Sequence, residues 1–200
     1  MQSQNEYIGD EKFKKFLEHY KCLAPLGVIK MRFAGTICSP NTDLRPTDVI
    51  SSLWEEGQEP RLQTKDEAEL FFKFFMGLWD KMFENIGFNK LKLPEFETKD
   101  IAEMATSRYN ELEFGFLEGF FGGKDNVQIP AFVGQITDSL SELAEVYQIL
   151  SKRAQKGEDK DLLLQTLKDT DKMVQKAINF IVENYALPKI KNIGDQALRN

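Results

Sequence analysis

The stretch DEAELFFKFFMGLWDKMFEN, residues Asp66–Asn85, decides the fold of this chain. At helical spacing it forms one broad apolar face, and its polar or small residues fall into a narrow stripe. The apolar face consists of Leu70, Phe71, Phe74, Phe75, Leu78, Trp79, Met82, Phe83 and Ile86, widened by Phe72 and Met76. A helix that is apolar around most of its circumference is covered by other helices on several sides. We therefore expect residues 66–86 to form the central helix of the protein.

Helical patterns continue on both sides of this stretch. Thr64 with Glu67 three residues later is a capping box that starts the central helix, and Gly87 is expected to end it. Further helices are predicted over 9–23 with Asp10 as N-cap, 26–38, 47–55, 98–121, 130–154 and from about 162 to Pro188. No segment alternates with the period of a strand. The sequence predicts an all-α fold of about seven helices, with a single domain over 1–188 and a tail over 189–200.

Small residues mark a place where two backbones approach each other. Gly115 and Gly119 lie one turn apart within the predicted helix 98–121, where each costs about 1 kcal/mol of helix propensity relative to Ala. They are explained if another backbone crosses there closely. Separately, the predicted helix 26–38 carries a small-residue spot at Ala34 and Gly35. The pair Gly122-Gly123 is expected to stop the helix.

The composition disfavours several classes of function. The net charge is −6 and the sequence pI is about 5.0, so phosphate backbones repel the chain unless it carries a local basic patch, for which Lys152–Lys156 and Lys189–Lys191 are candidates. The N-terminal residues show no basic or apolar leader, and no window is apolar enough to span a membrane, which predicts a cytoplasmic protein. Cys22 and Cys38 are expected to be reduced thiols in or near the core.

The sequence shows no set of residues for catalysis, a metal or a cofactor. His19 is the only histidine, and no Cys-x-x-Cys pair or glycine-rich loop after a strand is present. The carboxylates of Glu111 and Glu118 share a helix face, but a solvated face explains them without chemistry. Trp54 and Tyr109 lie beside loops and are candidates for a partner surface, although Trp54 also fits the core. The candidate interaction surface is Trp54, Tyr109, Glu111, Gly115, Glu118 and Gly119.

Four segments resemble the YecA/YgfB-like family of bacterial proteins. They are FAGTICSP (33–40), RPTDVISSLW (45–54) followed by the capped helix from Thr64, FLEGFFGG (116–123), and the acidic turn over 158–161 before a final long helix, which resembles the YgfB branch in particular. The likeness covers most of residues 13–185. The zinc-binding Cys/His tail of the longer YecA type is absent. The resemblance implies an all-helical fold and regulatory contact with other proteins.

Three hypotheses about function follow from these observations. The first is a non-enzymatic helical module that binds an unknown partner protein, with a homodimer through aromatic or glycine-bearing helix faces as one form of it. The second is a small-ligand binder or enzyme with a pocket lined by Phe and Glu, which a deep apolar cavity with convergent Glu or Arg side chains would favour. The third is an acidic regulator that associates with nucleic-acid-binding partners.

Overall fold

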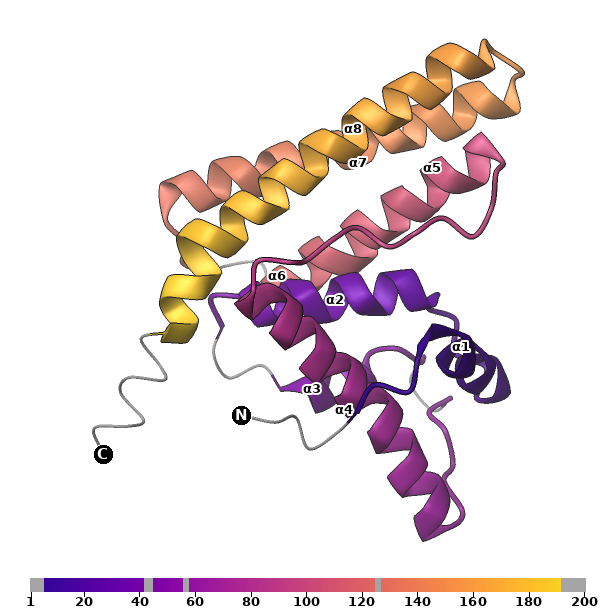
Figure 1. Ribbon diagram of the computed structural model, residues 1–200, viewed down its shortest axis with the longest axis vertical. Coiled ribbons are helices and arrows are strands. Elements are labelled where there is room, and N and C mark those ends of the chain that lie inside the picture. Colours follow the sequence, from indigo (N-terminus) through magenta and orange to yellow (C-terminus); the bar gives the residue numbers. More distant parts are fainter. Residues whose placement is uncertain (1–5, 42–44, 56–57, 125–126, 192–200) are drawn as a thin grey trace.

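The structure, a computed structural model, describes residues 6–41, 45–55, 58–124 and 127–191 (Figure 1). Within these ranges the chain contains helices and no strand. The elements are α1 (Asp10–His19), α2 (Leu26–Cys38), α3 (Pro46–Ser51), α4 (Lys65–Gly87), α5 (Ile101–Asn110), the π-helix η1 (Glu111–Leu117), α6 (Glu118–Phe121), α7 (Ala131–Gln155), α8 (Lys160–Ile181) and the π-helix η2 (Val182–Ala186). Because α5, η1 and α6 follow one another without a break, as do α8 and η2, the described part has seven helical rods. The predicted all-α fold class is confirmed.

An aromatic cluster holds the N-terminal half together. Phe13 and Phe16 of α1 pack on α4, with ring centroids 5.0 Å apart for Phe13 and Phe75 and 4.5 Å apart for Phe16 and Phe74. Trp54, which follows α3, closes the cluster against Phe71 at 5.9 Å. Tilted and edge-on aromatic pairs at these separations stabilise a core beyond their buried area. The phenylalanine-rich stretch therefore forms the aromatic core that its composition predicts.

Helix α2 lies between the two halves of the molecule. Ten of its 13 residues are buried, because it packs against α4 on one side and against η1 and α6 on the other. A Cβ atom at Gly35 would lie 2.0 Å from the carbonyl oxygen of Phe116, and one at Gly119 would lie 2.2 Å from that of Arg32. Only glycine fits at such distances. The predicted close crossing at Gly115 and Gly119 is confirmed, and helix α2 is the crossing partner.

Helix α4 is covered on fewer sides than its composition suggests. Leu70, Phe72 and Phe83, which we expected on the buried face, are 47%, 46% and 44% exposed. The buried residues of α4 lie on the side that meets α1, α2 and α3, while Gly77 is covered by the chain at residues 6–7. The apolar band of α4 is wider than the surface its neighbours cover. Figure 1 shows α4 extending away from the α7–α8 hairpin.

The helix ends agree with the predictions in some places and differ in others. Thr64 and Glu67 form the predicted capping box, and Gly122 and Gly123 have φ values of 61° and 66°. Helix α4 ends at Gly87, as predicted, and the left-handed residue that follows it is Asn89, with a φ of 53°. The N-cap of α1 is Gly9 rather than the predicted Asp10. At the other end of the chain, helix continues past Pro188 to residue 191. The π-turns of η2 immediately before Pro188 change the i→i−4 pattern with which a proline ring collides.

The C-terminal half is a hairpin of long helices laid on a third. Helices α7 and α8 pack along each other, and both contact α5 (Figure 1). The N–H groups at the start of α8 are capped by the Asp159 side chain, and α5 is capped by Asp100. None of the described helices is long and apolar enough to cross a membrane. Cys22 and Cys38 are free thiols, half-buried and buried respectively.

Candidate functional site

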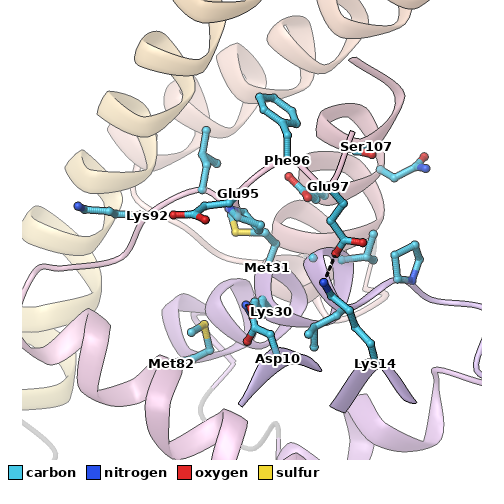
Figure 2. A pocket seen from close by; sticks show the side chains of 18 of the residues that line it. Asp10, Lys14, Lys30, Met31, Met82, Lys92, Glu95, Phe96, Glu97 and Ser107 are labelled. Atoms are coloured by element: carbon cyan, nitrogen blue, oxygen red, sulfur yellow. Dashed lines mark hydrogen bonds and ion pairs between the residues drawn. The ribbon is translucent and has the colours of Figure 1, made fainter. Parts of the chain in front are cut away.

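A cleft lies under the segment 88–100, which connects α4 to α5 and which we call the strap. Its volume is about 990 Å³. Helix α1 and the first turns of α2 form one wall, and the strap forms the other. Figure 2 shows Glu97 of the strap reaching Lys14 of α1 across this space, and Lys92, Glu95 and Phe96 of the strap also line the cleft. Met31, Met82 and Leu93 supply the apolar part of the lining.

The strap is held in place at several points along its length. The side chain of Gln175 on α8 accepts a hydrogen bond from the Leu93 N–H at 2.9 Å and donates one to the Leu91 carbonyl at 2.9 Å. Near its other end, Glu97 forms an ion pair with Lys14 at 2.9 Å, drawn as the dashed line in Figure 2. The strap thus has a fixed backbone at one end and, at the other, an ion pair between half-buried Lys14 and exposed Glu97.

Charged side chains of both signs line the cleft. Four are the lysines 14, 30, 90 and 92, and five are the carboxylates Asp10, Glu11, Glu95, Glu97 and Glu111. Asp10 accepts hydrogen bonds from Lys30 and from the Tyr7 hydroxyl, the latter at 2.6 Å. Burial alone would raise the pKa of Asp10, but the two hydrogen bonds outweigh it and lower the pKa. Asp10 therefore stays ionised and holds Lys30 at the cleft wall.

Behind the cleft wall lies a buried ion cluster made of Arg108, Glu111, Tyr147 and Asp171. Arg108 is 5% exposed, donates to the Glu111 carboxylate through Nη1, and donates through Nε to Asp171 at 3.1 and 3.2 Å. The Tyr147 hydroxyl donates to Asp171 at 2.6 Å. The guanidinium carbon of Arg108 also lies 3.9 Å from the ring centroid of Phe96 on the strap. The cluster joins α5, η1, α7, α8 and the strap.

Glu111 is the member of this cluster that reaches the cleft. Its carboxylate packs against the first turn of α2 so closely that a Cβ atom at Gly27 would lie 2.4 Å from Oε1. Burial raises the pKa of Glu111 to about 7, and the charge and hydrogen bond of Arg108 offset only part of that effect. Glu111 is the first residue of the π-helix η1, and π-turns occur often at functional sites.

The structure places the six predicted surface residues in different environments. Trp54, Gly115 and Gly119 are buried inside the fold, and Glu111, also buried, reaches only the lining of the cleft. Trp54 donates its indole N–H to the Tyr20 carbonyl at 3.0 Å inside the aromatic cluster. Tyr109 is half-buried and Glu118 is exposed. The tyrosine ring packs edge-on against Phe114, which is 48% exposed, at 5.8 Å.

Sequence reasoning missed three members of the ion cluster. Arg108 and Glu111 lie three residues apart on one helix face, which is a local signal that pairs them. Asp171 lies 63 residues from Arg108, and Tyr147 has the helical spacing of an ordinary core residue, so no local signal marks either.

The basic candidates, the single histidine and the residue types that could bind a metal lie as follows in the structure. Of the basic candidates, Lys189 donates hydrogen bonds to the carbonyl oxygens of Ile37 and Ser39 at the end of α2. Its ammonium group is therefore engaged within the fold. His19 is exposed at the end of α1, against the Tyr20 ring. Among the described residues, no group of three His, Cys, Asp or Glu side chains is arranged to hold a metal ion.

The chain was compared with protein-family models, with curated proteins and with solved structures, and none of them matches it. The resemblance to the YecA/YgfB-like family therefore stays a prediction.

Proposed function

We propose that this protein is a non-enzymatic interaction module that binds a segment of a partner protein in the cleft under the strap. The observation that carries the proposal is the lining of the cleft, in which charges of both signs alternate with apolar side chains over a volume of about 990 Å³. Such a lining suits a polypeptide segment, whose side chains offer charges of either sign next to apolar groups.

The strap supplies unpaired charges for such a segment. Lys92 and Glu95 are exposed, lie on the cleft wall and carry opposite signs (Figure 2). Leu93 and Phe96, both half-buried in the cleft lining, offer apolar contact. Polar contacts at the rim with apolar contacts at the centre are the usual anatomy of a protein interface. The rim charges would then select the partner segment, and the apolar floor would supply most of the binding energy.

A small-molecule ligand is the second candidate, and one observation favours it. Glu111 and the ring of Phe96 converge on one cleft, and the cleft volume falls within the range of about 300–1,000 Å³ that small-molecule pockets occupy. Against it stands the share of charged side chains in the lining, which is larger than in most pockets of that kind. The same cleft serves both candidates, so one set of experiments separates them.

The test uses a photo-crosslinking amino acid placed at Glu95 in the cleft, with Gln148 on the exposed side of α7 as the matched control position. Our proposal expects a defined polypeptide to be captured from Glu95 and not from Gln148 in cells of the native host. A synthetic peptide with the captured segment should then bind the unlabelled protein, and the charge reversal Lys92→Glu should weaken that binding roughly tenfold.

Two results would overturn the proposal. One is equal capture from both positions, and the other is peptide binding that Lys92→Glu leaves unchanged. Native mass spectrometry of the purified protein tests the second candidate. A small molecule that stays bound to the wild-type protein, and is lost when Ser107→Trp fills the cleft from α5, would assign the cleft to that ligand instead.

A further inference from the structure

The α7–α8 hairpin carries an apolar face that no described element covers. Five large apolar side chains on these two helices are between 40% and 58% exposed, namely Phe132, Ile149, Leu162, Met173 and Phe180. Figure 1 shows the hairpin along one edge of the molecule with α5 beneath it. Isolated exposed apolar residues are normal, but a set along one pair of helices marks an interaction surface.

The contacts of the hairpin show where this face points. On α7, Ser151 meets Thr106 of α5 at 2.9 Å, so that side of the helix faces inward. On α8, the inward side carries Asp171 and Gln175, which bind Arg108 and the strap. At about 100° per residue, Ile149 and Met173 lie on the opposite sides of their helices. Leu162 and Phe180 point away from α5 by the same count, whereas Phe132 points sideways, toward Phe180 of α8.

Two rows of opposite charge lie on the exposed sides of α7 and α8. Asp138, Glu142 and Glu145 follow one another on α7 at steps of four and three residues, and all three are exposed. Lys168, Lys172 and Lys176 follow one another on α8 at steps of four and are also exposed. On α8, the lysine row lies between the apolar residues and the inward side, so it forms one outer edge of the hairpin face. On α7, the acidic row lies around Ile149, opposite the inward side and away from Phe132, which contacts α8.

The two rows do not neutralise each other within one chain. Among the ion pairs between described residues, none joins α7 to α8, and Lys172 pairs only with Asp169 of its own helix, at 2.7 Å. The width of the hairpin separates the rows. If a second copy of the hairpin faced this one, its lysine row could lie against the acidic row of the first copy.

The rows also match in height along the hairpin. The helices run antiparallel, with Phe132 in contact with Phe180 and Tyr147 in contact with Asp171. These two contacts fix the register of the helices, and the rise per residue then gives the height of each side chain along the hairpin axis. Three acid–lysine pairs have the same height to within about one helical turn: Asp138 and Lys176, Glu142 and Lys172, and Glu145 and Lys168. Lys152 and Asp161 continue the two rows with their signs exchanged, and they are level with each other by the same count.

We propose that two copies of this chain pair face to face through the α7–α8 hairpins, about a twofold axis that runs along the helices. A rotation about such an axis leaves heights unchanged and places α7 of one copy over α8 of the other. Each acid on α7 then meets the lysine at its level on the partner's α8, and every pair occurs twice because the interface is isologous. A twofold axis across the helices would instead place α7 over α7 and bring acids against acids.

The size of the face sets the strength of the dimer. The apolar row on α8 from Leu162 to Phe180 spans about 27 Å, and two adjacent helices are about 20 Å wide. An interface of this size falls at the lower end of the range for stable complexes, so the dimer is weak and reversible. Its ion pairs join exposed side chains, so added salt weakens it. The proposal is independent of the cleft and of its occupant.

The test uses two charge-reversal variants that leave the core untouched. One replaces the acidic row by lysines (Asp138→Lys, Glu142→Lys and Glu145→Lys), and the other replaces the basic row by glutamates (Lys168→Glu, Lys172→Glu and Lys176→Glu). Sedimentation of the wild-type protein should show a dimer whose dissociation constant rises roughly tenfold or more between low and high salt. Each variant alone should be monomeric, because it carries one sign on both rows, while an equimolar mixture should form a heterodimer.

A control variant reverses charges outside the face and leaves the net charge unchanged. Lys81→Glu with Glu84→Lys exchanges the two charges of an exposed ion pair on α4 and should leave the wild-type dimer unchanged. Circular dichroism checks that each variant is folded. A wild-type protein that stays monomeric at low salt and high concentration overturns the proposal, as does a dimer that survives both row reversals. A mixture that fails to form the heterodimer, although both variants are folded, overturns it as well.

Discussion

Gly119 of α6 lies against the carbonyl oxygen of Arg32 on α2, so closely that a Cβ atom there would come within 2.2 Å of that oxygen. On the other side of the same crossing, a Cβ atom at Gly35 would lie 2.0 Å from the carbonyl oxygen of Phe116. The two helices are in backbone contact at this point. Helix α2 can therefore occupy the space between the two halves of the molecule without pushing them apart.

Gly119→Ala is expected to destabilise the protein by about 3 kcal/mol or more, because the added methyl group meets backbone atoms that move only with a whole helix. Gly134→Ala is the matched control. It also lies within a helix, and its added Cβ atom would meet only the Cδ1 of Ile129 at an ordinary 3.7 Å. The control should stabilise the protein by about 0.5–1 kcal/mol through helix propensity. Urea unfolding of both variants checks the contrast, and equal effects would contradict the backbone contact.

The sequence is sufficient to predict that another backbone approaches Gly115 and Gly119, because the signal is local, but it does not identify α2 as that backbone. Two glycines one turn apart in a helix lower its helix propensity, and close packing explains why they are there. The capping box is also a local signal, because Thr64 and Glu67 are only three residues apart. The exposure of Phe72 and Phe83 on α4 could not be predicted in this way. Which part of an apolar band is covered depends on the width of the neighbouring helices, and that is set by tertiary packing.

The candidate site was predictable only in part, for the same reason. Glu111 was singled out from its helix face, and Arg108 lies within reach of the same local reasoning. Asp171 contacts Arg108 although the two residues are 63 positions apart in the sequence. The cleft likewise depends on the hydrogen bond between the strap and Gln175 of α8. Contacts of that range leave no pattern in a single sequence. The fold class is therefore more accessible from this sequence than the site.

Replacing the central cation of the ion cluster should be costly. Arg108→Met leaves the carboxylates of Glu111 and Asp171 without their shared partner in a buried setting, and we expect a loss of about 3–5 kcal/mol of unfolding free energy. Arg153→Met removes a comparable but exposed ion pair with Glu158 and should cost about 1 kcal/mol or less. Chemical denaturation at neutral pH measures both. Similar losses for the two variants would mean that burial of the cluster contributes nothing.

The Tyr147 hydroxyl group is expected to stabilise the fold through one hydrogen bond to a charged group. Tyr147→Phe keeps the buried ring and removes the 2.6 Å bond to Asp171, which predicts a loss of about 1.5–3 kcal/mol. Tyr185→Phe serves as the control, since the Tyr185 side chain takes part in ring contacts and its change should stay within about 0.5 kcal/mol. Thermal unfolding of the pair is the measurement. A neutral Tyr147→Phe would show that Asp171 is satisfied without the hydroxyl.

The raised pKa of Glu111 predicts a particular dependence of stability on pH. Burial brings the pKa of the folded state to about 7 from an ordinary value of 4.5, so between these values the folded chain holds a proton that the unfolded chain has lost. The contribution of Glu111 to stability is therefore full below about pH 4.5 and is lost as the pH rises to about 7, by an amount on the order of 3 kcal/mol. Glu111→Gln cannot ionise, so the unfolding free energy of the wild type relative to this variant should fall across that interval. Urea titrations of both proteins from pH 4.5 to 8 provide the comparison. A difference that stays constant, or rises with pH, would show that the ion pair with Arg108 outweighs burial and that Glu111 is charged throughout.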